Sequence, residues 1–182
     1  MPQKPEILHK EIVARSQIFR VEAVELKFSN GEQRTYERLL SRRPAVLIVP
    51  ILNNEHIVLI REYGVGLDNY ELTFPKGLVE ENETLLQGAQ RELQEEAGYA
   101  AQQLTFLRDL SMSPGYMMHK TSIILAQDLY VAPLAGDEPE IIEVVTWPIA
   151  DVNGLLQRED FTEGRSIAAL YLALQHINDQ AR

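Results

Sequence analysis

The sequence contains no cysteine among its 182 residues. This excludes a disulfide framework, a thiolate zinc site and a cysteine nucleophile. Basic residues are also scarce, because 17 lysines and arginines stand against 27 aspartates and glutamates, for a net charge of −10. General binding to nucleic acid or to an anionic membrane needs a basic surface, so we expect neither partner. An anionic small substrate stays compatible with this charge, since divalent cations can lie between phosphates and carboxylates.

Long apolar segments are missing as well. The longest apolar run, Ala45–Leu52, is far too short to span a bilayer. Residues 1–10 lack the apolar stretch of a signal peptide. With 45% hydrophobic and 24% charged residues, the composition is that of a globular protein that builds its own core. We therefore expect a cytoplasmic protein with no membrane partner.

The first forty residues are predicted to form an antiparallel β element. Residues 19–28 roughly alternate between apolar and polar, as a half-buried strand does. Asn30-Gly31 is typical of a tight hairpin turn, after which residues 33–39 return as a second strand. A boundary after this hairpin divides the chain into the β element, residues 1–44, and a larger domain, residues 45–182.

The larger domain mixes strands with two helices. Residues 45–52 and 56–60 are almost entirely apolar, which predicts strands buried on both faces. A helix is predicted from residue 86 to residue 97, because apolar residues recur there at helical spacing and Gly98 stands where the helix should stop. Strands layered with helices indicate the α/β fold class. The remaining predictions are strands at residues 104–110, 122–130 and 143–147 and a helix at residues 166–177.

The segment between Gly77 and Tyr99 concentrates acidic residues around a single base, Arg91. In a helix, Glu92 and Glu96 lie one turn apart and project together, and Glu95 also lies about one turn from Glu92. Three carboxylates beside an apolar face repel one another and favour a bound counter-charge. Hard oxygen ligands on a rigid helix suit Mg²⁺ or Mn²⁺. Taken alone, the same residues are also compatible with an acidic helix face that simply contacts solvent.

The wider spacing favours the metal interpretation, because the segment resembles the Nudix box throughout. The one soft position is Tyr99, where the family more often has an aliphatic residue that serves in packing. The resemblance implies a Nudix hydrolase, with an α/β/α sandwich built on a mixed sheet and a metal-dependent cleavage of nucleoside diphosphates linked to another moiety. The matching residues are Gly77, Glu83, Arg91, Glu92, Leu93, Glu95, Glu96 and Gly98.

The resemblance also implies which residues hold the metal. Glu92 and Glu96 would be the principal ligands, and Glu95 would lie close to the metal. The backbone carbonyl of Lys76 would be a further ligand. The implied cofactor is Mg²⁺, with Mn²⁺ as an alternative.

Four other residues of the box would have supporting roles by the same resemblance. Arg91 would hold the acidic cluster in place through ion pairs, and Glu83 would support that network. Gly77 and Gly98 would allow the loop and the end of the helix to turn.

Further segments resemble the ADP-ribose pyrophosphatase branch of the family. Pro114 follows Gly98 by 16 residues, about where that branch has a proline. Two segments just before the box look like its substrate-contacting region, Arg61-Glu62-Tyr63 and Tyr70-Glu71-Leu72. The predicted substrate-binding residues are therefore Arg61, Tyr63, Glu71 and Pro114. From the residues alone, an exposed arginine and a core tyrosine are alternative interpretations of Arg61 and Tyr63.

The same resemblance bears on the assembly of the protein and on its contacts with phosphate. Residues 16–39 look like the dimerising β element of that branch, which implies a homodimer. One departure stands out, since Phe74-Pro75-Lys76 precedes Gly77 where the branch usually has Pro-Ala. A lysine at this position could alter phosphate contacts or access of the metal.

Hydrolysis also needs a base that takes a proton from the attacking water. Residues 136–140 form an acidic loop in a position similar to the catalytic loop of the branch. We favour Glu138 over Glu140 as the base, with Glu95 as the other candidate. The alternative for the loop is an acidic turn in contact with solvent.

Three functions are compatible with these observations. The first is hydrolysis of ADP-ribose, NADH and diadenosine polyphosphates with release of AMP. The second is a Nudix pyrophosphatase for nucleoside triphosphates or nucleotide sugars, against which Pro114 and the N-terminal strands weigh. The third is a non-catalytic domain that senses ADP-ribose or NAD metabolites. This third function predicts a decayed metal helix, whereas every carboxylate of the box is present here.

Overall fold

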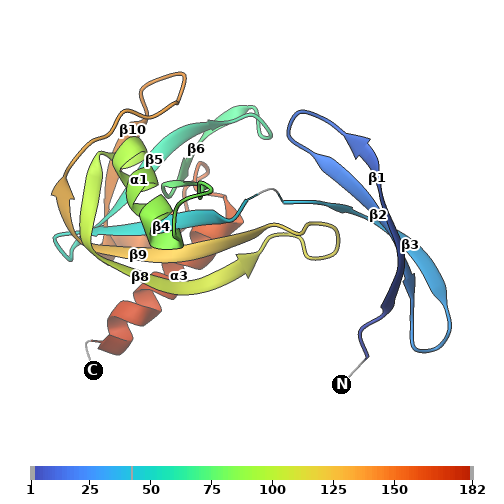
Figure 1. The fold of residues 1–182 in the computed structure, drawn as a ribbon. Coiled ribbons are helices and arrows are strands. Elements are labelled where there is room, and N and C mark those ends of the chain that lie inside the picture. Colours follow the sequence, from blue (N-terminus) through green and yellow to red (C-terminus); the bar gives the residue numbers. More distant parts are fainter. Residues whose placement is uncertain (1–2, 42, 181–182) are drawn as a thin grey trace. The chain divides into compact units, whose positions relative to one another are not determined.

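The computed structural model describes residues 3–41 and 43–180. The chain forms two compact units, one made of Met1–Arg42 with Ser111–Lys120 and the other of Arg43–Leu110 with Thr121–Arg182. Each unit is built on its own β-sheet, with three strands in the first and seven in the second (Figure 1).

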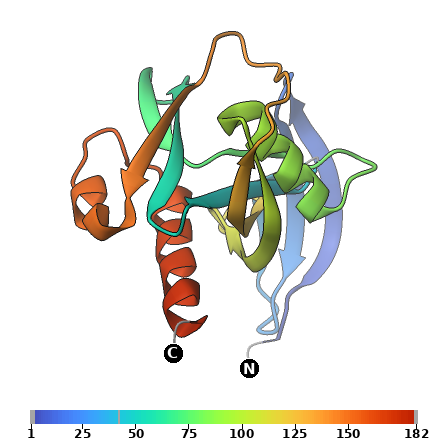
Figure 2. The same ribbon diagram turned by 90° about the vertical axis from the view of Figure 1, so that its left-hand side faces the viewer.

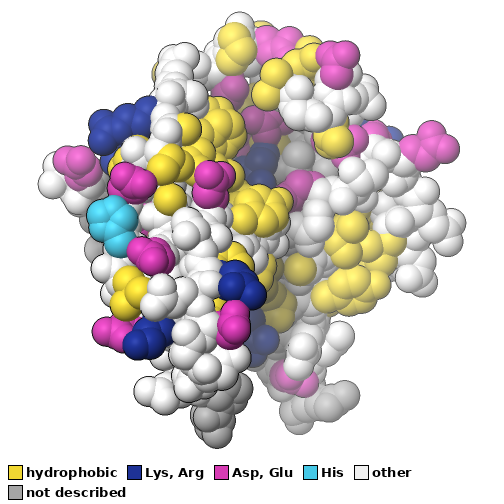
Figure 3. Space-filling model, turned by 90° about the vertical axis from the view of Figure 1, so that its right-hand side faces the viewer, with side chains coloured by type: hydrophobic (Ala, Val, Ile, Leu, Met, Phe, Trp, Pro, Cys, Tyr) yellow, Lys and Arg dark blue, Asp and Glu magenta, His cyan; other side chains and the backbone are white. Residues whose placement is uncertain are grey.

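The sheet of the first unit is antiparallel, with the order β1 (Glu6–Arg15), β2 (Arg20–Lys27) and β3 (Gln33–Leu39). The predicted hairpin turn joins β2 to β3, and Gly31 has a φ of 87°, which glycine adopts without strain. All of β1 except Ile12 is exposed, so this strand has no buried face that would impose an alternation of apolar and polar residues. Figure 3 shows a face of the molecule on which apolar side chains, in yellow, lie exposed between charged ones.

The segment Ser111–Lys120 is the part of the first unit that is remote in sequence. The Leu39 N–H donates to the carbonyl of Tyr116 at 2.7 Å, and the Met118 N–H donates to the carbonyl of Leu39 at 3.0 Å. A groove of about 290 Å³ lies between this segment and the β2–β3 hairpin, and Pro114 is among the residues that line it. The first unit therefore contains more than the N-terminal stretch that the sequence pattern delimited.

The second unit contains a mixed sheet of the order β10-β5-β4-β9-β8. β4 and β9 run parallel, whereas β4 pairs with β5, β5 with β10, and the short strands β6 and β7 with β5 and β4, all antiparallel. The strands are β4 (Ala45–Leu52), β5 (His56–Gly64), β6 (Asn69–Thr73), β7 (Lys76–Leu78), β8 (Tyr99–Ser111), β9 (Lys120–Val131) and β10 (Glu143–Pro148).

Helices cover both faces of this sheet, which confirms the predicted α/β/α sandwich. Successive residues of a strand point to opposite faces. Leu47 of β4 accordingly packs in the core beneath α3 (Gly164–Gln180), and Val46 packs in the core beneath α1 (Leu85–Ala97). Figures 1 and 2 show α1 and α3 on opposite sides of β4. A single turn of 3-10 helix (Ile149–Asp151) and the short α2 (Val152–Leu156) follow β10, and the sequence pattern did not predict either.

The limits of α1 are fixed by its own sequence. Thr84 caps the first turn by accepting from the Gln87 N–H, and the Gln87 side chain in turn accepts from the Thr84 N–H at 2.8 Å. Gly98 ends the helix in the left-handed conformation, at a φ of 74°. These caps fix the two ends of the helix, and the packing of Ala89, Leu93 and Ala97 on the sheet sets the direction in which its glutamates point.

Among the described helices, none is both long enough and apolar enough to cross a bilayer.

Candidate active site

The glutamates of α1 lie against β7, where the chain leaves the sheet. Glu92 and Glu96 are buried, with 9% and 7% of their surface exposed. Gly77 of β7 leaves the space that the Glu92 carboxylate fills, because a Cβ at position 77 would collide with that group. A side chain at this position would displace the carboxylate, so glycine keeps this space open for Glu92.

Arg91 holds three glutamates on one side of the helix. Its guanidinium donates to Glu83 at 2.8 Å and 3.1 Å, to Glu92 at 2.9 Å and to Glu95 at 2.8 Å, and it also donates to the Leu78 carbonyl at 2.9 Å. The hydrogen bond from Arg91 lowers the pKa of Glu83, and the same bond raises the pKa of Arg91. The structure thus places Arg91 at the centre of the acidic cluster, bonded to three of its carboxylates.

Glu96 lies on the other side of the cluster, next to Lys76. The Lys76 backbone N–H donates to its carboxylate at 2.8 Å. Burial raises the pKa of Glu96 to about 8, although the positive charge of Lys76 acts in the opposite direction. Burial likewise raises the pKa of Glu92 in spite of Arg91. Two buried carboxylates whose charge is incompletely balanced form a place for an additional cation.

The donor set fits a hard divalent cation, since it consists of carboxylate oxygens on one rigid helix. Within the described residues, no three acidic or imidazole groups are already gathered around one point as metal ligands. The reason is that Glu92 and Glu95 are turned toward Arg91, and Glu96 toward the Lys76 N–H. Each of these bonds engages one oxygen of its carboxylate, so Glu92, Glu95 and Glu96 can keep their internal partners and still offer a second oxygen to Mg²⁺ or Mn²⁺.

The acidic loop that follows β9 borders the same space. Glu138 lines a cavity of about 480 Å³ together with Glu95 and Glu96. Its side chain is still exposed, and its pKa is raised by partial loss of solvent and then by the neighbouring charges of Glu62 and Asp137. A carboxylate with a raised pKa is a better proton acceptor than an ordinary one.

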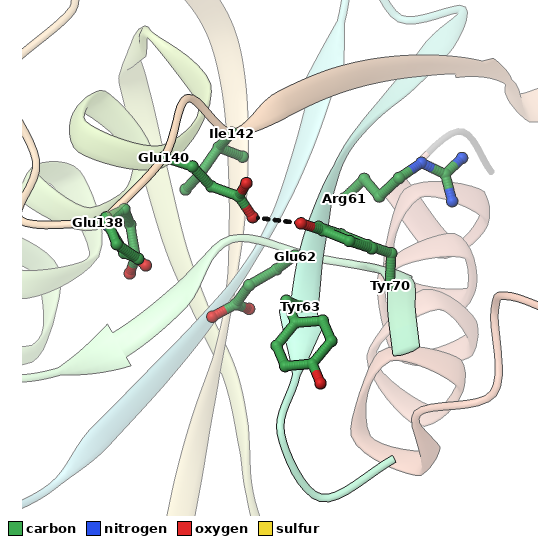
Figure 4. A pocket seen from close by; sticks show the side chains of 8 residues that line it. Arg61, Glu62, Tyr63, Tyr70, Glu138, Glu140 and Ile142 are labelled. Atoms are coloured by element: carbon green, nitrogen blue, oxygen red, sulfur yellow. Dashed lines mark hydrogen bonds between the residues drawn. The ribbon is translucent and has the colours of Figure 1, made fainter. Parts of the chain in front are cut away.

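A second cavity of about 340 Å³ adjoins the first, because Glu138, Pro139 and Glu140 line both. Its other wall carries Tyr63 and Tyr70, whose rings meet edge to face at 5.4 Å between centroids. The two tyrosines face each other across the β5–β6 pair. Figure 4 shows the hydrogen bond by which the Tyr70 hydroxyl donates to Glu140, at 2.8 Å.

Comparison with known proteins identifies this arrangement. A family model of the NUDIX domain matches residues 41–170, and one of the NudE-type Nudix hydrolase N-terminal domain matches residues 5–38. The chain belongs to the Nudix hydrolase family. It is 50% identical to the ADP compounds hydrolase NudE of Escherichia coli over 181 residues, which are 99% of this chain and 97% of that protein.

Two further comparisons agree with the family. The crystal structure of an ADP compounds hydrolase superposes with a TM-score of 0.93 at 50% identity and covers 100% of this chain and 98% of the other. The ADP-ribose pyrophosphatase of Bacillus subtilis is 26% identical over 92% of this chain and 95% of its own. This Nudix chain is accordingly a pyrophosphatase, and Nudix hydrolases generally need a divalent metal.

Of the four predicted substrate-binding residues, two line the second cavity and two lie away from it. Tyr63 lines the second cavity, and its hydroxyl bonds to Asp68. Arg61 lines it as well, but its guanidinium is paired with Asp160 at 2.6 Å and Glu143 at 2.8 Å, and Figure 4 shows it directed away from Tyr63.

Glu71 and Pro114 lie elsewhere. Glu71 is buried and accepts a hydrogen bond from the Thr162 hydroxyl at 2.9 Å, which ties β6 to the segment before α3. Pro114 belongs to the first unit, in the groove described above. Contact of either residue with substrate remains a prediction.

Sequence reasoning missed Tyr70 and Glu62 as individual candidates. Both lie in the two segments that resemble the ADP-ribose pyrophosphatase branch, yet the pattern gave no reason to prefer them over their neighbours. The alternation of β5 and β6 is the signal that would have found Tyr70, because it places this residue directly opposite Tyr63.

Proposed function

We propose that this Nudix hydrolase cleaves the diphosphate linkage of ADP compounds, namely ADP-ribose, NADH and diadenosine polyphosphates, and releases AMP. The observation that carries the proposal is the pair of adjoining cavities, which share Glu138 as a wall. One cavity presents the carboxylates of α1, and the other presents the rings of Tyr63 and Tyr70. A carboxylate site suits a metal-bound diphosphate, and aromatic rings suit a nucleotide base.

Each group of the chain then has a defined task. Glu92, Glu96, Glu95 and the Lys76 carbonyl hold Mg²⁺, or alternatively Mn²⁺. The bound metal neutralises phosphate oxygens and lowers the pKa of a water molecule. Arg91 keeps Glu92 and Glu95 in place through the bonds described above. Arg61, Tyr63, Glu71 and Pro114 are the proposed contacts to the nucleotide.

Glu138 is the proposed base that accepts the proton of the attacking water. Its position at the cavity that Glu95 and Glu96 line supports this role, as does its raised pKa. Glu140 is less suited, because its carboxylate already accepts the Tyr70 hydroxyl. Glu95 is the remaining candidate, and its bond to Arg91 lowers its availability as a base.

We further propose that the protein is a cytoplasmic homodimer that pairs through the N-terminal β element, residues 1–44, while residues 45–182 form the Nudix domain. The large apolar side chains left exposed on this element support such an interface. Residues of β1 and of the turn to β2 contribute them, namely Ile7, Leu8, Val13, Ile18 and Phe19.

The experiment is a substrate panel with Mg²⁺, Mn²⁺ or EDTA. ADP-ribose, NADH and diadenosine triphosphate are compared with nucleoside triphosphates and nucleotide sugars, and AMP is quantified by chromatography. We expect AMP release that requires metal and is lost in Glu96→Gln. Turnover confined to triphosphates or to sugars without adenosine would replace the proposed substrates, and ADP-ribose binding without any turnover would indicate a sensor.

A further inference from the structure

Lys76 makes two contacts at the active site, of which the proposed function uses neither. Its backbone N–H donates to Glu96, and its ammonium forms an ion pair with Glu62. The ammonium is well enclosed, with 19% of the side chain exposed. Lys76 is also the only lysine of residues 43–110 and 121–182, where the other cationic side chains are arginines or histidines.

The charge of Lys76 acts on the carboxylates on both sides of the cavity. It opposes the rise in the pKa of Glu96 and of Glu138, whereas the charge of Glu62 adds to both. Figure 4 shows the carboxylates of Glu62 and Glu138 extending toward the same space. The ammonium therefore lies among three carboxylates, close to where a divalent cation and a diphosphate would meet.

The other cation of the cluster cannot take the same role. Arg91 is fixed by Glu83, Glu92, Glu95 and a backbone carbonyl, so all of its bonds would have to break before it could move. Lys76 carries a compact charge on a flexible stem, and among residues 3–41 and 43–180 only Glu62 holds that charge by an ion pair. A mobile cation beside a metal site can change partner when an anion arrives.

We propose that Lys76 is a diphosphate-binding residue whose ammonium rests on Glu62 before substrate arrives and, while it rests there, weakens the binding of divalent cations. The inference builds on the proposed function, because it assigns the anion to the diphosphate of the same substrates. It follows from the sign of the charges: an ammonium repels a second cation nearby and attracts phosphate oxygens. Transfer of the ammonium from Glu62 to the diphosphate keeps the site balanced when metal and substrate are both bound.

The first measurement is the Mn²⁺ affinity of the metal-free, full-length protein, determined by a calorimetric titration. We expect Lys76→Met to bind Mn²⁺ about 3- to 30-fold more tightly than the unaltered protein, since one nearby positive charge is removed. The substitution keeps the backbone N–H that holds Glu96. A misfolded variant would bind the metal less tightly, so the sign of the effect separates the proposal from loss of structure.

The second measurement is the affinity of α,β-methylene-ADP, a diphosphate that cannot be hydrolysed at that linkage, at saturating Mn²⁺. Lys76→Met should bind it about 10-fold less tightly, and Lys76→Arg should recover part of the loss. Glu62→Gln should shift the affinity in the opposite direction, because the ammonium no longer has a competing partner. Arg108→Met is the matched control: it removes the same charge from an exposed position on β8 and should change neither affinity.

Both effects of Lys76→Met must appear together. Unchanged or weaker Mn²⁺ binding by Lys76→Met overturns the inference. Equal affinity of the two proteins for the analogue overturns it as well, and so does failure of the analogue to bind the unaltered protein. These equilibrium measurements do not depend on turnover. Failure of the unaltered protein to hydrolyse ADP compounds would therefore refute the proposed function separately.

Discussion

Glu96 is the residue at which burial and charge oppose each other most directly. Burial raises its pKa from 4.5 to about 8, and a bond from the Lys76 N–H compensates only in part. The carboxylate is costly to bury as an anion without a cation beside it. At the scale of single residues, the active site is thus arranged so that a bound cation relieves an existing electrostatic cost.

This cost predicts a pH dependence of stability in the metal-free protein. Because the pKa of Glu96 is higher in the folded state, that state retains a proton which the unfolded chain releases above pH 4.5. The stability contributed by Glu96 is complete below pH 4.5 and is lost as the pH rises toward 8. We expect urea unfolding to show a steeper decline of stability for the unaltered protein than for Glu96→Gln over this range. Equal slopes would show that Glu96 does not titrate as proposed.

Glu138 gives a second prediction at this scale. We expect Glu138→Gln to lower kcat by about 100-fold or more, since general-base catalysis contributes roughly that factor. Mn²⁺ binding should persist and weaken by no more than about 30-fold, the effect of one nearby charge, because Glu138 is not among the proposed ligands. The matched variant Glu140→Gln removes the same charge from the same loop and should retain most of the turnover. Near-normal kcat in Glu138→Gln would exclude this residue as the base and favour Glu95.

At the scale of elements, α1 is the helix that carries the glutamates of the candidate active site. Its caps at Thr84 and Gly98 set its limits, and its buried stripe, packed on the sheet, sets the direction of the glutamates. The predicted helix began at residue 86 and ended before Gly98, and the observed helix begins one residue earlier. Such an element is predictable, because its caps and its periodicity are local properties of the chain.

The cap gives the prediction at this scale. Thr84→Ala removes the side chain that accepts from the Gln87 N–H, and we expect it to lower the free energy of unfolding by about 1 kcal/mol. Metal affinity should fall with it if the first turn frays. Chemical denaturation measures the loss, and Glu81→Ala, an exposed change in the preceding turn, is the control. A loss no larger than that of the control would show that the box does not depend on this cap.

At the scale of the whole molecule, the chain consists of two units that are not consecutive in sequence. The first unit gains Ser111–Lys120 through hydrogen bonds between Leu39 and the residues Tyr116 and Met118. Such hydrogen bonds join residues that are far apart in the chain, and no local sequence pattern predicts them. The sequence therefore suggested a boundary at residue 44 but gave no indication of the second segment.

The assembly can be tested on the same scale. We expect the full chain to sediment as a dimer at micromolar concentration, and a chain that begins at Pro44 to sediment as a monomer with little turnover. The exposed apolar side chains of β1 provide the physical reason, because their burial against a second copy would stabilise the pair. A full chain that sediments as a monomer would contradict the homodimer.

The sequence by itself determined the features that depend on neighbours along the chain. These include the α/β class, the capped helix and the spacing that places Glu92 and Glu96 on one face, all set by the geometry of a single element. Only the tertiary structure decided which partner each side chain finds. Arg61 pairs with Asp160, Tyr70 meets Tyr63 and bonds to Glu140, and Lys76 rests on Glu62. Such contacts depend on how strands and loops pack, and packing brings together residues whose separation in sequence carries no signal of their proximity.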